Sequence, residues 1–547
     1  MSDASFGVAA RASWRLPLAR ETALCTGLTT AVAALLVWLA PRGGDLAAHE
    51  YQRSLFLGHG FTLWDNFWYA GRYAFVGYSV LYYPLAALLG ISLLAVLTVA
   101  IAGGAFASLL EQEWGAAARW AGRCFALLWP GVMLVAELPL ALGVALALLC
   151  LLALRRGRGW TGAALIVLVL AASPVAFVLL AVWLLGTAVG RRRGLRLRGA
   201  AVPALAVALA TAAELVTLHL FPTGTLGFPA GEAVQAVAFC VVLLGLTWRL
   251  ELARGLRGFL AVYLLVVLAT YAIPSGLGHD VARMRLLALP ITLLVAALRR
   301  WRPLPVVLVA VGLAAAWNLF PLASGWAGSA ADSSANAAVW TSPVGYLHAH
   351  LRTGYRVEAV DTSEHWPALY LARARIPLVR GWFRQDDHPV AALLYRRRFT
   401  GAEYVAWLRR LGVAYVVLAN APPDHSSRRE ANLVRSRNTG LRQVFATREV
   451  SIYAVPQPRP IVTGPGRPRV LALRESRLVL RVPRGGTYRV AVRWSPYWRT
   501  SSGCLLEGAD GMLRLHTPAA ATVRIAFDVD ASGLFDAFAG TARTCAS

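Results

Sequence analysis

The stretch LPLALGVALALLCLLAL, residues 138–154, decides the class of this fold, and the basic cluster at residues 155–158 follows it directly. An uncharged run of this length is typical of a helix that crosses a membrane, because the lipid interior offers no partner to exposed backbone groups or charges. Similar apolar runs recur over the first 325 residues. With 57% hydrophobic residues and a mean hydropathy of +0.55, the chain is predicted to be a mostly α, polytopic helical membrane protein.

About eleven membrane segments are predicted in this part of the chain. They are residues 22–40, 84–108, 118–135, 138–154, 160–172, 174–189, 200–220, 232–248, 258–273, 284–298 and 304–322. The stretch 160–189 is open to two interpretations, because Ser173-Pro174 either breaks one long helix or separates two short ones.

Arginine predicts the orientation, since all 54 basic residues are arginine. If the N-terminus is cytoplasmic, nineteen arginines fall in cytoplasmic loops of the membrane part. Only five fall in its outer loops, namely Arg42, Arg53, Arg72, Arg283 and Arg285. The positive-inside rule therefore predicts a multi-pass protein of the plasma membrane with a cytoplasmic N-terminus and an extracytoplasmic C-terminal domain.

The first apolar stretch has a second interpretation. Arg11, Arg15 and Arg20 precede it, a pattern that also describes a secretory signal peptide. No small-x-small cleavage site precedes Asp45, and Pro41 directly follows the run. We therefore predict an uncleaved anchor.

The sequence predicts four parts. Charged residues return after about residue 330, where a predicted helix at 401–411 leads into the apolar strand 413–418, as in an α/β layer. Short alternating strands such as 487–494 then suggest a β-sandwich. The predicted parts are a cytoplasmic tail at 1–21, a membrane domain at 22–325 with an outer loop at 41–83, an exported α/β subdomain at 330–458 and an exported β-sandwich at 460–547.

The predicted exported region is strongly basic, with 30 arginines against 16 acidic residues after residue 330. This excess favours lipid head groups or anionic glycans as partners, and an outside location excludes nucleic acid. Cys504 and Cys545 are its only cysteines, so an oxidising compartment predicts a disulfide between them.

The outer loop carries the residues most suited to chemistry. If residues 46–57 form a helix, Asp45, His49 and Arg53 share one face, while Glu50 lies about 100 degrees round. A carboxylate beside an imidazole and a guanidinium can bind a divalent cation, accept a proton from a sugar hydroxyl or hold a phosphate. The alternative is that Asp45 caps the helix.

Aromatic side chains crowd the rest of this loop, with ten between residues 61 and 83. An interfacial aromatic belt is one explanation. The other is a sugar-binding surface, in which rings stack on sugar faces and interleaved polar groups orient the ligand. The candidates for that surface are Trp64, Trp68, Tyr69, Arg72 and Tyr82.

Several short motifs together resemble those of the GT-C superfamily of membrane glycosyltransferases. They are the Gly-x-Asp-x-x-x-His of residues 43–49, the Trp-x-x-x-Trp-Tyr-x-Gly of 64–71 and the Tyr-Tyr-Pro-Leu re-entry at 82–85. The likeness continues through 274–285, 380–386 and 495–498. It is strongest to the bacterial branch labelled as 6-pyruvoyl-tetrahydropterin synthase-related membrane proteins.

The resemblance implies a reaction. GT-C enzymes take a sugar from a polyprenyl-phosphate donor at the outer membrane face, and an acidic residue of the first outer loop serves as base or metal ligand. That role maps to Asp45, and the acceptor would be an envelope glycan, lipid or protein. Many relatives carry a second acid beside the first, whereas here the neighbours are Gly44 and Leu46. Glu50 and Asp280 are the candidate partners around a Mg²⁺ or Mn²⁺ ion.

Two more loops are candidates for substrate binding. Arg283 and Arg285 can neutralise the donor phosphate, or they can simply extend to the membrane interface. Arg384 belongs to the loop 380–387, which either reaches the membrane site or packs structurally. Two other functions fit the topology, namely a transporter or flippase for a lipid-linked substrate and a non-catalytic scaffold with an exported binding domain.

Overall fold

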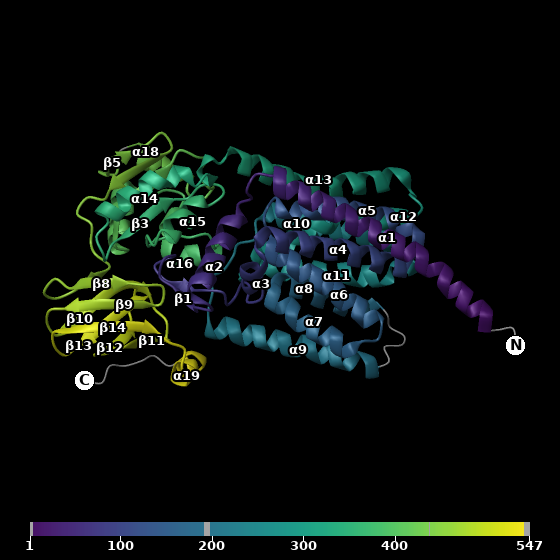
Figure 1. The fold of residues 1–547 in the computed structure, drawn as a ribbon, viewed down its shortest axis with the longest axis horizontal. Helices are drawn as coiled ribbons and strands as arrows, with labels where there is room; N and C mark the ends of the chain where they lie inside the picture. The colour runs from purple at the N-terminus through teal and green to yellow at the C-terminus, as the bar shows by residue number, and fades with distance from the viewer. Residues whose placement is uncertain (1–3, 191–196, 437, 541–547) are drawn as a thin grey trace. The chain divides into compact units, whose positions relative to one another are not determined.

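The computed structural model describes residues 4–190, 197–436 and 438–540 (Figure 1). They form two compact units, each described by itself. The helical unit comprises Met1–Gly43, Tyr78–Leu215 and Thr225–Ala327. The mixed unit comprises Gly44–Gly77, Val216–Gly224 and Gly328–Ser547.

Apolar helices build the helical unit. Their bounds are α1 Ala4–Leu39, α3 Tyr82–Leu89, α4 Ile91–Trp114, α5 Arg119–Leu128, α6 Leu138–Arg155, α7 Gly159–Ala172, α8 Pro174–Gly190, α9 Leu197–Leu220, α10 Ala230–Thr247, α11 Arg254–Ala272, α12 Ala288–Leu298 and α13 Leu304–Ala331. The 3-10 helices η1 Gly115–Ala118, η2 Trp129–Met133, η3 Glu251–Ala253 and η4 Gly278–Leu287 connect them.

The predicted class is confirmed, because every predicted membrane segment is mainly helical. In the described part, eight helical stretches are long and apolar enough to cross a membrane, and α7 and α8 are shorter apolar helices. The chain is therefore a multi-pass membrane protein. Segments 84–108 and 118–135 both overlap one of these stretches, Ile91–Met133. The helix α5 alone would span about 15 Å, half the thickness of a hydrocarbon core, so the segment count and the orientation stay predictions.

The open question at Ser173-Pro174 is settled in favour of two helices. Residue 172 ends α7 and Pro174 begins α8, where a missing N–H costs nothing. The hydroxyl of Ser173 accepts a hydrogen bond from the Ala176 N–H at 3.3 Å.

Small residues allow the helices of this unit to pack closely, as is usual in membranes. A Cβ on Gly103 of α4 would lie 2.2 Å from Oγ1 of Thr29 in α1. A Cβ on Gly186 of α8 would lie 2.4 Å from the backbone of Phe259 in α11. Side chains larger than hydrogen at these positions would push the helix pairs apart.

The mixed unit contains an α/β layer whose sheet has the order β3-β4-β6-β5. Its strands are β3 Arg356–Val360, β4 Val413–Ala419, β5 Arg442–Ala446 and β6 Val450–Ala454. The strands β3 and β4 are parallel, and the β4–β6 and β6–β5 pairs are antiparallel. The helices of this layer are α14 Ala338–His350, α15 Trp366–Arg373, α16 Arg384–Ala391, α17 Gly401–Arg410 and α18 Arg428–Arg435, and the 3-10 helices η5 Ser333–Ala335 and η6 Ala392–Tyr395 join them.

A sandwich of two four-stranded sheets follows, with the orders β12-β13-β10-β7 and β11-β14-β9-β8. Its elements are β7 Val462–Thr463, β8 Arg469–Leu473, β9 Arg477–Val482, β10 Gly486–Arg493, β11 Trp498–Thr500, β12 Cys504–Glu507, β13 Met512–Thr517, β14 Ala521–Phe527 and α19 Ala531–Ala539. The predicted helix at 401–411 and the predicted strands at 413–418 and 487–494 are observed as α17, β4 and β10.

The predicted outer loop differs from expectation. The sequence places residues 41–83 with the membrane domain, yet Gly44–Gly77 belongs to the mixed unit. It forms α2 Asp45–His59 and a small hairpin of β1 Trp64–Asp65 and β2 Arg72–Tyr73. Backbone bonds fasten it there, because the N–H of Asn66 donates to the Glu475 carbonyl at 2.9 Å and the N–H of Arg493 donates to that of Ala70 at 2.9 Å.

Candidate functional site at the carboxyl ends of β3 and β4

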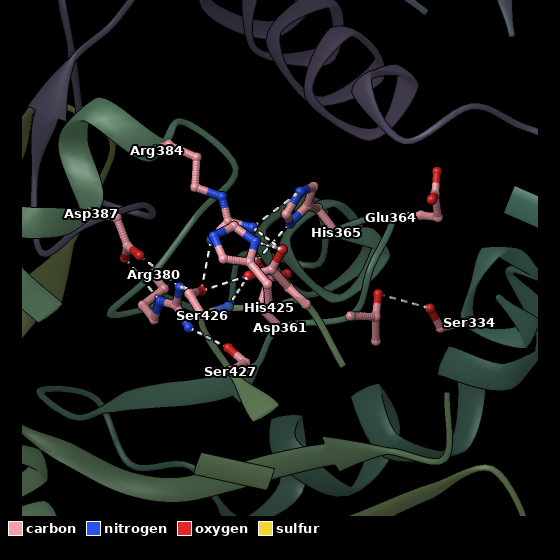
Figure 2. A network of polar contacts seen from close by, with 12 residues as sticks. Ser334, Asp361, Glu364, His365, Arg380, Arg384, Asp387, His425, Ser426 and Ser427 are labelled. Carbon is pink, nitrogen blue, oxygen red and sulfur yellow. Dashed lines mark hydrogen bonds and ion pairs between the residues drawn. The ribbon is translucent and has the colours of Figure 1, made fainter. Parts of the chain in front are cut away.

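A cluster of polar side chains follows the carboxyl ends of the parallel strands β3 and β4 (Figure 2). Asp361 comes directly after β3, and Asp424 and Ser426 follow β4. Loops at the carboxyl ends of parallel strands are where open α/β sheets usually bind ligands. The cluster is therefore the candidate functional site of this unit.

Arg384, at the start of α16, joins the two loops. Its Nη2 lies 2.5 Å from Oδ1 of Asp424 and 3.7 Å from Oδ2 of Asp361. Its Nη1 donates to Oγ of Ser426 at 2.7 Å. The sequence singled out Arg384 as a binding residue, but it did not indicate these partners.

His365 completes the cluster from the N-terminal end of α15. Its Nδ1 lies 2.6 Å from Oδ2 of Asp361, and its Nε2 lies 3.5 Å from Nη2 of Arg384. Its φ is +59°, a strained value for a residue with a Cβ, and such strain is concentrated at functional sites. Burial disfavours the imidazolium, but the adjacent Asp361 carboxylate outweighs it and raises the pKa of His365.

Asp424 is the most strongly stabilised anion of the cluster. Burial opposes its charged form, yet hydrogen bonding from His425 and the charge of Arg384 hold the pKa of Asp424 well below its usual range. His425 is largely exposed, with 72% of its side chain accessible. One flank of the cluster is therefore open to a ligand.

Beneath this surface, Arg380 forms a buried support. Its Nε and Nη2 donate to both oxygens of Asp387 at 2.8 Å and 2.6 Å. It also donates to the hydroxyls of Ser427 at 2.5 Å and Ser426 at 2.9 Å. Tyr395 donates to Asp387 at 2.6 Å. The fork of Arg380 thus holds both the 380–387 loop and the 424–427 loop.

Glu364 connects the cluster to the start of α2. An added Cβ on Gly44 would lie 2.6 Å from Oε2 of Glu364, and one on Gly328 would lie 2.9 Å from its Oε1. Ser329 donates to Oε2 at 2.8 Å. Because consecutive Cα atoms are 3.8 Å apart, the Cα of Asp45 lies within about 8 Å of this carboxylate. Tertiary structure therefore places a second acid near Asp45, which sequence reasoning missed.

The environment of Glu364 favours proton binding. Only 9% of the residue is exposed. Burial raises the pKa of Glu364, while the bond from Ser329 and the charge of His365 oppose the rise. Asp45 itself is half-buried at the first position of α2. A buried carboxyl beside a partly open one is an arrangement suited to holding and moving a proton.

The helix α2 is longer than the predicted 46–57, and its polar residues differ from expectation. Its N-cap is Gly44, so the alternative that Asp45 is the capping residue is wrong. His49 is fully buried, which does not support its predicted contact with substrate. Arg53 is half-buried on the same helix. Glu50 pairs with Arg373 of α15 at 3.7 Å.

Most of the aromatic residues of the loop are packed in the interior, whereas Phe61 is exposed and Tyr78 is half-buried. Trp64 is 1% exposed and stacks on Phe527 of the sandwich at a centroid distance of 4.9 Å. Trp68 is fully buried, contacts Tyr51 at 4.2 Å, and its indole donates to the Ala368 carbonyl at 3.0 Å. Tyr69 is fully buried and Tyr82 is 1% exposed. The predicted stacking by these four rings is therefore wrong, because a buried ring face cannot meet a sugar.

Arg72 also has a structural role. It is 3% exposed, and its Nε donates to Oδ2 of Asp386 at 2.8 Å. Its guanidinium lies 4.0 Å from the ring centroid of Phe383. Arg72 thus ties the hairpin to α16 and is not accessible to substrate as predicted.

Arg283 and Arg285 lie in η4 of the helical unit, within a group of acids. Arg283 is 2.9 Å from Asp280 and 3.4 Å from Glu137. Arg285 is 3.9 Å from Glu137 and 3.8 Å from Glu232. That these arginines extend to the membrane interface stays a prediction. Binding of a phosphate by these arginines stays a prediction, and existing acids already balance their charge.

The predicted metal and disulfide sites stay predictions. Asp45 and Glu50 belong to the mixed unit, whereas Asp280 belongs to the helical unit and pairs with Arg283. Within the described ranges, no group of three or more His, Cys, Asp or Glu side chains is arranged to hold a metal ion. Cys504 begins β12, and Cys545 lies outside the described residues.

Comparisons with known proteins give a remote likeness. No protein-family model and no curated protein matches the chain. Among solved structures, a cryo-EM structure of the arabinofuranosyltransferase AftD from mycobacteria is 20% identical with a TM-score of 0.45, covering 81% of this chain and 40% of that chain. Two further matches are classes of one AftD mutant. One is 15% identical with a TM-score of 0.46, covering 95% of this chain and 60% of that chain. The other is 19% identical with a TM-score of 0.43, covering 81% of this chain and 41% of that chain.

The chain thus spans between 40% and 60% of the length of these AftD chains. Likeness at these scores does not assign an activity. The three matches also give no support to the 6-pyruvoyl-tetrahydropterin synthase-related branch.

Proposed function

We propose that this protein is a membrane glycosyltransferase that moves a sugar from a polyprenyl-phosphate donor to an envelope glycan, lipid or protein acceptor at the outer membrane face. The observation that carries the proposal is the contact of Glu364 with Gly44. By this contact the Cα of Asp45 lies within about 8 Å of the Glu364 carboxylate, and Glu364 directly precedes His365 of the polar cluster in the chain. The GT-C-like motifs around Asp45 supply the reaction class.

In the proposed step, Asp45 accepts the proton of an acceptor hydroxyl. The freed oxygen bonds to the anomeric carbon of the donor sugar, and the bond from that carbon to the phosphate oxygen breaks with inversion. The polyprenyl phosphate leaves with the bonding electrons. The polar cluster, with Arg384 at its open flank, hydrogen-bonds the hydroxyls of the sugar or the acceptor.

Glu364 is proposed as a positioning residue. A neighbouring anion disfavours the charged form of a carboxylate and therefore raises its proton affinity. At working pH, an ionised Glu364 would make Asp45 a stronger base. A divalent cation would add charge stabilisation if one bound between carboxylate oxygens. Among the residues of the mixed unit that the structure describes, no three acidic, His or Cys side chains form a ligand set, and no step above depends on a cation.

Replacing Asp45 with asparagine tests the proposal. In cells that depend on this chain, we expect lipid-linked sugar to accumulate and the corresponding envelope glycan to disappear, as measured by mass spectrometry. The control is Asp528→Asn, an exposed aspartate that directly follows β14 and lies outside the cluster. Unchanged glycans at normal protein levels would contradict catalysis. Lipid-linked sugar trapped on the cytoplasmic face would favour the flippase.

Gly44→Ala tests the contact that carries the proposal. The φ of Gly44 is −62°, which any residue adopts, so the only cost is the approach of the new Cβ to Glu364. We expect transfer to fall about tenfold, as for a small misplacement of a supporting group, with little loss of stability. Gly58→Ala on the same helix has no atom within 4 Å of its Cβ and serves as the control. Equal rates in both variants would refute the placement of Glu364.

A further inference from the structure

The helical unit contains a cavity that the proposed function does not use. Its volume is about 330 Å³, and α4, α6, α8, α11, η4 and α12 line it. Apolar side chains dominate the wall, including Leu148, Leu151, Leu180, Trp183 and Ile291. The volume is within the range of ligand sites, roughly 300 to 1,000 Å³.

The shape of the cavity suits a chain. Along α8 its wall runs from Ala176 to Thr187, a rise of about 16 Å. Leu148, Leu151 and Leu184 are half-buried, so the wall is not sealed from the surrounding lipid. An apolar cavity does not hold water well, and a lipid tail is the apolar group that a membrane supplies.

Among the described residues that line this wall, the charged side chains lie at one end. Glu113 near the end of α4 forms an ion pair with Arg155 at the end of α6, and both line the cavity. The indole of Trp114 donates to the Leu252 carbonyl at 2.9 Å. A Cβ on Gly190 of α8 would lie 2.7 Å from the Arg254 carbonyl. The ends of four helices therefore meet at the mouth of the cavity.

The charge at this mouth is positive. Arg155, Arg156, Arg158 and Arg254 are exposed there, and two of them are ion-paired, Arg155 with Glu113 and Arg254 with Glu251. Each arginine near a membrane surface attracts an anionic lipid by about 1 kcal/mol. It is also the end that the positive-inside rule assigns to the cytoplasm.

We propose that this cavity binds one acyl chain of an anionic phospholipid from the arginine-rich side, with the head group at the end that carries Arg155, Arg156, Arg158 and Arg254. The lipid fills the space between α4, α6, α8 and α11 and so fixes the packing of these helices. This site does not depend on glycosyl transfer.

Photo-crosslinking of the full chain in lipid nanodiscs tests this site. The probe is phosphatidylglycerol with a diazirine near the end of one acyl chain, and labelled peptides are identified by mass spectrometry. We expect labels on the wall residues of α6, α8 and α11. Unlabelled phosphatidylglycerol should compete at least about fivefold better than phosphatidylcholine, the factor that one arginine contributes.

Two variants make the test specific. Ala147→Trp places a ring in the cavity and should lower wall labelling at least about tenfold, as expected when one bound chain is excluded. Ala164→Trp on α7 carries the same change on an exposed surface and should label as the wild type does. If Ala147→Trp does not reduce labelling of the wall residues, the proposed site is refuted. Equal competition by both phospholipids, or stronger competition by a polyprenyl phosphate, would refute the proposed occupant.

Discussion

Replacing Arg380 with methionine is expected to lower the free energy of unfolding by about 3–5 kcal/mol, the cost of removing one partner from a buried ion pair. Arg380 is 3% exposed and satisfies both oxygens of Asp387. Its Nη1 also lies 3.6 Å from Glu430, which is fully buried. Methionine fills the space but leaves Asp387 buried without its charge partner.

The acids around Arg380 explain why the loss is large. Glu358 and Glu430 are both fully buried. Burial raises the pKa of Glu430 to about 7, against the opposing effects of Arg380 and a hydrogen bond from Tyr404. Without Arg380, these carboxyls take up protons at neutral pH or force the loops apart. Both outcomes disturb the loop 424–427, which carries Asp424 and Ser426.

Thermal unfolding of the full chain in detergent, combined with hydrogen exchange of the β3 and β4 peptides, measures this effect. Arg435→Met on α18 removes an exposed arginine and serves as the control, with an expected change within about 0.5 kcal/mol. Arg380→Lys keeps the positive charge but loses the bidentate guanidinium, and its loss of unfolding free energy should lie between those of Arg380→Met and the control. A methionine variant as stable as the control would show that the network contributes little.

The second large effect is expected on rate. Asp45→Asn should lower transfer by purified protein about 10²- to 10⁴-fold, the usual contribution of a general base. Glu364→Gln should lower it about tenfold, because Asp45 then loses the anion that raises its proton affinity. If both carboxyls act on one proton, the double variant is no slower than Asp45→Asn alone.

The pH profile separates this role from simple structural support. Glu364→Gln removes a nearby negative charge, so the pKa of Asp45 falls and the acid limb of the rate profile moves to lower pH. Glu475→Gln, at a buried glutamate paired with His59 and Arg375, controls for loss of an ion pair in the same unit. Multiplicative rate losses with an unshifted acid limb would show that Glu364 acts independently of Asp45.

The local sequence pattern was sufficient to predict an element where a single physical requirement, such as burial in lipid, governs all of its residues. Residues 138–154 have to be helical because apolar side chains and a satisfied backbone are both needed in lipid, and α6 Leu138–Arg155 follows that run almost residue for residue. The strand at 413–418 could be predicted as well, because β4 consists of apolar residues and Tyr along its length. The strand β3 was not, because its buried pattern includes Arg356 and Glu358.

The site depended on contacts that sequence spacing does not encode. A crowded aromatic loop beside a membrane segment is compatible with a surface belt or a binding surface. Trp64 and Trp68 are instead interior residues, because the sandwich and α15 supply partners that lie 463 and 300 positions away in the chain. One sequence signal could have indicated the polar cluster, because the polar residues at 361–365 and 424–427 each follow a strand. This signal predicts a shared site only if the two strands are known to be parallel neighbours.

By itself, the sequence determined the membrane class, the helices of the membrane part, the two folds after residue 330 and the choice of Asp45 as a candidate catalytic residue. These follow from composition and short-range periodicity, which depend on the solvent each side chain meets. Only the tertiary structure decided that the loop of Asp45 joins the mixed unit, and that Glu364 is the acid beside Gly44. Glu364 is 320 residues from Gly44 in the chain, and only folding brings such residues together.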